Sequence, residues 1–349
     1  MAEDLKTPGW RLPPWRVRTV IAGNKMDFIA WGIDLQGVPA VWVRSKGAGV
    51  RVAVLDTGVD LNHPDFKGAI AEVKDFSRSA WGIGDRQGHG THTAGTIGSR
   101  NNGRGTVGVA PLCDLIIGKV LGDDGSGSDA SVAAGIDWAV EKGSDVISMS
   151  LGAPSPSAVI QAALKRAVAA GVLIVVAAGN EGPGANTVGY PAAWRDLALA
   201  VGAVDKRREV ADFSSRGPEV DIMAPGVAVP SCWPGGDYAY LDGTSMATPF
   251  VAGVLALAIA SERAAGRKGY LSQREMEAAI TKSAVKLGSD PDGHSEDWGF
   301  GLVNPGEFVE TKPAPIVGAP PDPPGAMTFP IGNFAGFAWV LSATPSPKV

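Results

Sequence analysis

The chain has 349 residues, of which 45% are hydrophobic and 47 are glycine, so it can bury a substantial core in one large or two smaller domains. Its formal net charge is −5 and it has no basic block, which argues against a nucleic-acid partner. The longest apolar runs, 172–178 and 251–260, are shorter than a bilayer-spanning helix, so no membrane partner is expected.

The first residues and the cysteines predict a cytoplasmic protein. Residues 1–6 lack the basic-then-apolar pattern of a signal peptide. The two cysteines, Cys113 and Cys232, are not spaced as metal ligands and are interpreted as reduced structural thiols.

Composition divides the chain into three parts. Residues 1–30 show little periodic pattern, and the composition changes at Trp31, where the main domain (31–310) is expected to begin. Residues 311–349 are proline-rich and predict an extended tail. The last part of that tail, 327–341, is apolar and aromatic, and could dock either on the domain or on a partner.

Short apolar runs alternate with helix-like stretches through the main domain. Strands are expected at 50–55, 115–120, 146–149, 172–178 and 197–204, and helices at 89–97, 131–142 and 158–170. This alternation predicts an α/β fold with a mainly parallel sheet covered on both faces.

Gly243-Thr244-Ser245 precedes an apolar run, 250–260, and predicts a tight turn that opens a buried helix. Ser245 would lie in the first turn, where unpaired backbone N–H groups and the positive end of the helix dipole face outward. A hydroxyl there can attack a carbonyl, and its own N–H can help to hold the resulting oxyanion. An ordinary Ser/Thr helix cap is the alternative.

Four further residues are candidates to complete a nucleophilic site. Asp56 ends the strand at 50–55 and could orient a histidine, or it could simply form the turn before Thr57. His89 and His92, at the start of the helix at 89–97, compete as the general base or are helix-start and surface histidines. Asn180 follows the strand at 172–178 and could donate to an oxyanion, or it is a common turn residue.

The order Asp, His, Ser occurs in one of the known triad arrangements. Across residues 50–307 the chain resembles the subtilisin-like serine proteases. The matching stretches are Val54-Leu55-Asp56-Thr57-Gly58, His89-Gly90-Thr91-His92, Ser150-Leu151-Gly152, Ala178-Gly179-Asn180-Glu181-Gly182 and Gly243-Thr244-Ser245-Met246-Ala247. The resemblance implies a three-layer α/β/α fold, a catalytic domain at 31–310, a triad of Asp56, His89 and Ser245, and Asn180 in the oxyanion hole. It selects His89 rather than His92 as the general base.

The same resemblance implies where a polypeptide substrate binds. An extended substrate would add to an edge strand at Gly125, Ser126 and Gly127 and face a second segment at Ser150, Leu151 and Gly152. The pocket for the P1 residue, whose carbonyl is attacked, would be lined by Ala177, Ala178, Gly179, Glu181 and Gly189. This predicts broad specificity that favours large apolar P1 residues, with Glu181 able to tolerate a basic one. Asp129 stands where many relatives place an aromatic lid, which leaves the selectivity at P4 open.

A structural calcium ion is also implied by the resemblance. Asp65 and Asn102 would supply side-chain oxygens, and Arg100, Arg104 and Thr106 would supply carbonyls, which are the hard ligands that calcium needs. A polar glycine-rich turn is the alternative. Four other carboxylates are interpreted as solvated loop charges rather than ligands: Asp75, Asp85, Asp123 and Asp124.

Arg11-Leu12-Pro13-Pro14-Trp15 resembles the short segment of intracellular subtilisins that lies across the active-site cleft and blocks it. Proline suits such a segment, because it fixes φ and lacks an N–H. Residues 1–30 are therefore predicted to be an inhibitory pro-segment that proteolysis removes, with a disordered tail as the alternative.

Three functions remain in competition. The first is an intracellular, calcium-dependent serine endopeptidase that acts on unfolded or extended polypeptides. The second is a maturation peptidase for one partner, recruited by the aromatic tail at 329–339, and the third is a catalytically idle scaffold that binds peptides. The presence of Asp56, His89, Asn180 and Ser245 together argues against the third. Because intracellular relatives are often dimers, a homodimer is an open prediction.

Overall fold

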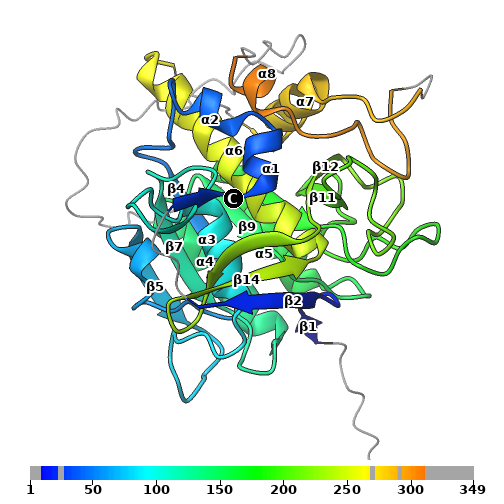
Figure 1. The fold of residues 1–349 in the computed structure, drawn as a ribbon. Helices are drawn as coiled ribbons and strands as arrows, with labels where there is room; N and C mark the ends of the chain where they lie inside the picture. The colour runs from blue at the N-terminus through cyan, green and yellow to red at the C-terminus, as the bar shows by residue number, and fades with distance from the viewer. Residues whose placement is uncertain (1–8, 23–26, 268–271, 290–292, 311–349) are drawn as a thin grey trace, which may run out of the picture. The chain divides into compact units, whose positions relative to one another are not determined.

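A computed structural model describes residues 9–22, 27–267, 272–289 and 293–310. A seven-stranded sheet runs through this part of the chain in the order β12-β11-β10-β9-β4-β7-β5, and every neighbouring pair is parallel (Figure 1). The strands are β4 (Arg51–Asp56), β5 (Ile70–Asp75), β7 (Asp114–Lys119), β9 (Val146–Met149), β10 (Leu173–Ala177), β11 (Leu199–Val204) and β12 (Ile222–Pro225). The α/β fold class is confirmed.

The central strands are apolar throughout because both faces of the sheet are covered. In β4, Val52 and Val54 enter one buried hydrophobic cluster, while Ala53 and Leu55 enter another. Successive side chains of a strand point to opposite faces, so one short run supplies both cores.

Helices cover the two faces in pairs. The helices α3 (His89–Gly98) and α6 (Thr244–Ala264) contact each other and one face, whereas α4 (Asp129–Glu141) and α5 (Ala158–Ala169) contact each other and the opposite face. The result is the expected three-layer α/β/α arrangement. Four other helices are described: α1 (Trp31–Leu35), α2 (Val38–Val41), α7 (Gln273–Ser283) and α8 (Pro305–Glu310).

The helix α6 corrects one expectation about apolar length. It spans 21 residues, beyond the run at 251–260, and by length and composition it could cross a membrane. However, 94% of its apolar window is buried inside the protein. Its hydrophobicity is therefore accounted for by its place between the sheet and the neighbouring elements, as in a core helix.

The first part of the described chain joins the main body through three short strand pairings. The strand β1 (Trp10–Arg11) is antiparallel to β8 (Ser126–Gly127), and β3 (Asp27–Ile29) is parallel to β6 (Gly105–Val107). Between them β2 (Arg16–Ile21) extends a ribbon of β13 (Val229–Trp233) and β14 (Asp237–Asp242), as Figure 1 shows. The predicted tail at 311–349 lies outside the described residues.

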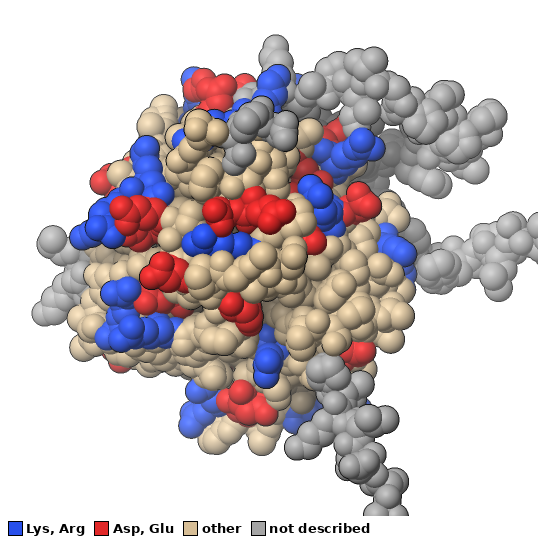
Figure 2. All heavy atoms as spheres, turned by 90° about the vertical axis from the view of Figure 1, so that its right-hand side faces the viewer, with Lys and Arg blue, Asp and Glu red and all other residues tan. Residues whose placement is uncertain are grey.

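Acidic and basic side chains are interspersed over the face shown in Figure 2. Several charges of the described chain are paired, for example Arg166 with Asp137 and Arg216 with Asp297, both at 2.8 Å. The exposed pair Arg166–Asp137 adds little stability.

Candidate active site

The end of β4 and the start of α3 bring Asp56 and His89 together. His89 Nδ1 donates to the Asp56 carboxylate, at 2.8 Å from Oδ1 and 3.0 Å from Oδ2, and both side chains are almost fully buried. The other carboxylate contacts are with Thr57 N at 2.7 Å and Thr93 Oγ1 at 3.3 Å. Asp56 thus fixes the orientation of the imidazole, and His89 Nε2 is left without a hydrogen-bond partner among the described residues.

Close packing explains the small residue after His89. A Cβ on Gly90 would lie 2.2 Å from the carbonyl oxygen of Gly58, so the helix can approach the end of β4 only with glycine there. The Gly90 N–H also donates to Thr57 Oγ1 at 2.9 Å.

Ser245 lies in the first turn of α6, where backbone N–H groups have no partner within the helix. Within the described part of the chain its hydroxyl has one long contact, 3.5 Å to the Ser150 carbonyl. Pro249 cannot donate a hydrogen bond to the Ser245 carbonyl four residues earlier, and the Ser150 hydroxyl donates to that carbonyl instead, at 2.9 Å. The turn before the helix uses Gly243 at φ 154°.

The side chain of Asn180 is held in one orientation by the residue before Ser245. Asn180 Oδ1 accepts from the backbone N–H and the hydroxyl of Thr244, both at 2.9 Å. Its Nδ2 is therefore directed away from Thr244, and it donates to the carbonyl of Pro14 at 2.6 Å. Asn180 presents a fixed donor to a peptide carbonyl, as an oxyanion hole requires.

His92, the competing histidine, lies one turn further along α3. Its Nε2 donates to the carbonyls of Val229 and Ala239, at 3.0 and 3.1 Å, and burial lowers its pKa to about 3. A neutral imidazole tied to two backbone carbonyls has a structural role in joining the helix to the β13–β14 ribbon.

A pocket of about 290 Å³ lies beside these residues and is lined by all five residues predicted for the P1 pocket, together with Gly152. It includes Gly152, Ala177, Ala178, Gly179, Glu181 and Gly189. Of the facing segment, the Leu151 side chain is fully buried in the core, and the Ser150 hydroxyl is used by α6. Those two residues therefore offer the cleft their backbone rather than their side chains.

Residues 10–15 occupy the cleft. Arg11 exchanges both backbone hydrogen bonds with Gly152, at 3.0 and 2.9 Å, and Leu12 N donates to the Gly125 carbonyl at 3.1 Å. Trp10 is paired with Gly127, which belongs to the same edge segment as Gly125 and faces Gly152 across the cleft. The segment is thus an extended strand between the two predicted substrate-binding segments.

Beyond these pairings the segment departs from an ordinary extended strand. Pro13 lines the pocket predicted for P1, but the carbonyl bonded to Asn180 belongs to the next residue, Pro14. Trp15 then packs against the imidazole of His89, with ring centroids 5.4 Å apart. The carbonyl at the Asn180 donor therefore belongs to the residue that follows the one in the pocket, and not to the pocket residue itself.

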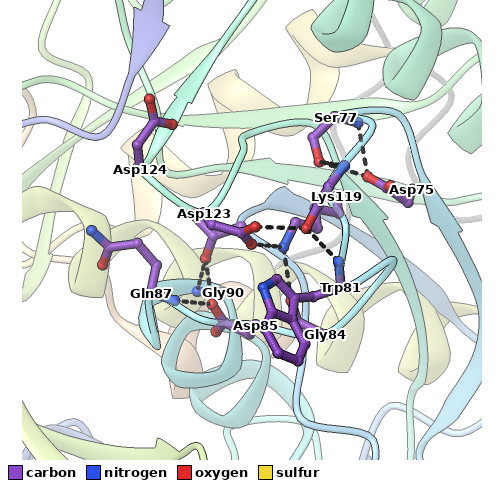
Figure 3. A network of polar contacts seen from close by, with 12 residues as sticks. Asp75, Ser77, Trp81, Gly84, Asp85, Gln87, Gly90, Lys119, Asp123 and Asp124 are labelled. Atoms are coloured by element: carbon purple, nitrogen blue, oxygen red, sulfur yellow. Dashed lines mark hydrogen bonds and ion pairs between the residues drawn. The ribbon is translucent and has the colours of Figure 1, made fainter.

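A polar network next to α3 was not expected from the sequence (Figure 3). Asp85 is only 6% exposed, and it accepts hydrogen bonds from the hydroxyls of Thr57 and Thr91 and from the N–H groups of Gln87, Gly88 and Thr91. Burial raises its pKa. The interpretation of Asp85 as a solvated loop charge is wrong: it ties the start of α3 to the residue after Asp56.

Lys119 continues this network (Figure 3). Its fully buried side chain donates to the Gly84 carbonyl at 2.7 Å and to Asp123 at 2.6 Å. Asp123 and Asp124 are exposed, as expected for loop charges, and Asp75 is half-buried. The signal for Asp85 was its position four residues before His89, but spacing alone does not show burial.

The residues predicted to bind calcium lie around one buried carboxylate. Asp65 accepts from Asn102 Nδ2 at 3.2 Å, from the Thr106 N–H at 3.1 Å and from the Tyr238 hydroxyl at 2.9 Å. Asn102 Oδ1 accepts from the Arg104 N–H at 3.1 Å. The guanidinium of Arg100 is turned to the carbonyls of Gly68, Pro111 and Cys113.

This donor set fits a calcium ion only in part. Oxygen ligands are present in Asp65 and the loop carbonyls, but Asn102 turns its amide nitrogen toward the carboxylate and would have to rotate. A softer metal fits less well, although His63, Asp65 and Cys232 have ligand atoms within 4.8 Å of one another. Both ring nitrogens of His63 are engaged by backbone groups, and burial raises the pKa of the Cys232 thiol well above its usual value.

Comparison with known proteins agrees with this geometry. The subtilase family profile matches residues 47–301. An intracellular serine protease of Paenibacillus polymyxa is 43% identical over 77% of this chain and 84% of its own length. Subtilisin Savinase of Lederbergia lenta is 44% identical over 79% of this chain and 97% of its own length. The major intracellular serine protease of Bacillus subtilis is 43% identical over 73% of this chain and 82% of its own length. The chain therefore belongs to the subtilase family of serine endopeptidases and is close to its intracellular members.

Proposed function

We propose that Asp56, His89 and Ser245 form the catalytic triad and that Asn180 and the Ser245 N–H form the oxyanion hole. The observation that carries this proposal is the bond from Asn180 Nδ2 to the Pro14 carbonyl, made while Thr244, the residue before Ser245, holds Asn180 Oδ1. His89 Nε2 takes the proton of Ser245 as the hydroxyl attacks the carbonyl carbon, and later returns a proton to the leaving amine. Asp56 holds the tautomer with a proton on Nδ1 and stabilises the imidazolium.

Active-site labelling tests the triad. A serine-directed phosphonate should label the activated wild-type chain at Ser245 and should not label Ser245→Ala or His89→Ala. Labelling of Ser245→Ala at another residue would refute the assignment of the nucleophile.

We propose that residues 10–15 inhibit the enzyme by binding as a substrate that is not cleaved. The support is the mismatch between Pro13, which lines the pocket, and Pro14, whose carbonyl meets Asn180. A peptide bond aligned for attack would need the carbonyl of the P1 residue itself at the donor. In addition, Trp15 covers the imidazole that must accept the proton.

Deletion tests the inhibition. A chain that lacks residues 1–18 should hydrolyse peptides faster than the full chain before any processing. A chain that lacks only residues 1–8 keeps Trp10 to Trp15 and is the matched control, with activity like that of the full chain. Equal activity of all three chains would contradict the proposal.

The substrates are proposed to be unfolded or extended polypeptides, cleaved with broad specificity and a preference for large apolar P1 residues. Backbone pairing with Gly125, Gly127 and Gly152 supports this, because it recognises any extended chain. Digestion of casein to many fragments is the expected result. Cleavage of a single partner protein, with casein left intact, would favour the maturation peptidase. Peptide binding without phosphonate labelling of Ser245 and without cleavage would favour the idle scaffold.

Calcium is proposed as a structural ion held by Asp65, Asn102 and the carbonyls of Arg100, Arg104 and Thr106. When bound, it would neutralise the buried carboxylate and tie the loop to the body. In the Ser245→Ala background, calcium should raise the thermal midpoint of unfolding relative to a chelator, and Asp65→Asn should abolish that difference. An equal response in both chains would place the ion elsewhere.

A cytoplasmic location is proposed from the two relatives named as intracellular proteases. Cell fractionation tests it. The homodimer stays a prediction, which sedimentation of the Ser245→Ala chain would check.

A further inference from the structure

Trp10 is the most deeply held residue of the segment in the cleft. Its side chain is 1% exposed and belongs to the hydrophobic cluster that α4 and α5 build against the sheet. Leu12, at 9% exposed, and Pro13 are also buried, whereas Arg11 is exposed and Trp15 is half-buried. The cleft therefore contains a deep apolar subsite that receives an indole.

A polar group of the subsite is directed at the indole nitrogen. Trp10 Nε1 donates to Asp129 Oδ1 at 2.5 Å. The other carboxylate oxygen, Oδ2, accepts from the Ser157 hydroxyl at 2.6 Å. Ser157 is the N-cap of α5 and accepts from the Ile160 N–H, so its position is fixed by the helix. Asp129 is half-buried and is thereby held with one oxygen toward the subsite.

The strand pairing gives this subsite its place in a substrate. Pro13 lines the P1 pocket, and the backbone of Arg11 and Leu12 is paired with Gly152 and Gly125. Counting back along the strand, Trp10 takes the P4 position. A substrate that replaces the segment on the same strand edges places its own P4 side chain beside Asp129.

We propose that Asp129 makes the P4 subsite selective for tryptophan. An aliphatic or phenyl side chain would fill the apolar part but leave the Asp129 oxygen that faces the subsite without the indole donor. Sites built to hydrogen-bond a substrate group discriminate against analogues that lack the group, because the site's own polar atom is then unpaired. The bond is also charge-assisted, which strengthens it. This inference rests on the proposed endopeptidase function.

The test compares two substrates that differ in one N–H. Internally quenched peptides Xaa-Ala-Ala-Phe carry tryptophan or its isostere benzothienylalanine at P4, and both are cleaved by the same full-length wild-type preparation. The fraction of enzyme still blocked by its own segment cancels in the ratio of the two kcat/KM values. We expect tryptophan to be favoured about tenfold, the order of a hydrogen bond to a charged group.

Two variants separate the subsite from a general effect of charge. Asp129→Leu should bring the ratio to about one. Asp137→Leu, on the same helix but at an exposed site paired with Arg166, should keep the wild-type ratio. A ratio near one in wild type, or a ratio unchanged in Asp129→Leu, would overturn the proposal. A peptide with lysine at P4 that is cleaved faster than the tryptophan peptide would also overturn it, because Asp129 would then act as a charge partner.

Failure of the proposed function is distinguishable from failure of this subsite. The same preparation is treated with a serine-directed phosphonate. If it is labelled and cleaves both peptides equally, only the tryptophan selectivity is refuted. If it is neither labelled nor active on any peptide, the proposed function is refuted, and the selectivity with it.

Discussion

Replacing Asn180 tests the proposed oxyanion hole at a single atom. Asn180→Ala removes the Nδ2 donor that lies 2.6 Å from a peptide carbonyl, and it also removes the Oδ1 acceptor used by Thr244. Asn180→Asp keeps an acceptor for Thr244 but puts an oxygen where the donor was. The two variants share only the loss of the donor.

The size of the effect follows from what the donor does. Loss of one side-chain donor from the oxyanion hole in subtilisin lowers kcat about 10²–10³-fold, or about 2.7–4 kcal/mol of transition-state stabilisation. We expect both variants to lose kcat on this scale, with KM nearly unchanged, because the donor acts mainly on charge that develops in the transition state. Steady-state hydrolysis of a peptide by chains lacking residues 1–18 measures both constants.

The comparison of the two variants can refute this reasoning. If Asn180→Asp keeps wild-type kcat while Asn180→Ala loses it, the support of Thr244 matters and the donor does not. If both keep wild-type kcat, Asn180 is not part of the oxyanion hole.

Three further predictions concern stability and are measured by unfolding in the Ser245→Ala background, where autolysis cannot interfere. Asp85→Ala leaves buried donors such as Thr91 N–H without an acceptor and should cost about 3 kcal/mol or more; a loss below about 0.5 kcal/mol would contradict this role. Gly90→Ala places a Cβ against the Gly58 carbonyl and should destabilise the chain strongly, whereas an unchanged midpoint would show that the helix can shift. Burial raises the pKa of Asp221 from 3.8 to about 7. Between these two pH values its carboxyl is neutral in the folded chain but ionised in the unfolded chain, so the stability that it contributes is lost as pH rises from about 4 to about 7. Asp221→Asn should reduce that loss, and an unaltered pH dependence would refute it.

The parts of the fold that could be predicted are those with a simple hydrophobic pattern. Buried central strands such as β4 and β9 are apolar on both faces and stand out as short runs. The edge strand β5 was missed because its residues are only half-buried or exposed. All six residues of β2 are exposed, and its partner β14 lies more than 200 residues away, so no local pattern marks it.

The candidate site divides in the same way. Motifs placed Asp56, His89, Asn180 and Ser245, because their residue types and order carry the chemistry. Sequence could not show that Asp85 is buried, since a solvated and a buried aspartate look alike before packing is known. Sequence also could not show that Pro13 lines the pocket while the carbonyl of Pro14 meets Asn180. That offset depends on how the backbone of the two prolines continues after the last strand pairing.

We propose above that this serine endopeptidase is inhibited by its own N-terminal segment. The most direct measurement is the intact mass of the purified wild-type and Ser245→Ala chains after incubation with calcium. We expect wild type alone to lose its N-terminal segment and to gain activity as it does so. Removal of the segment by the chain's own activity is contradicted if neither chain is shortened, or if Ser245→Ala is shortened as fast as wild type.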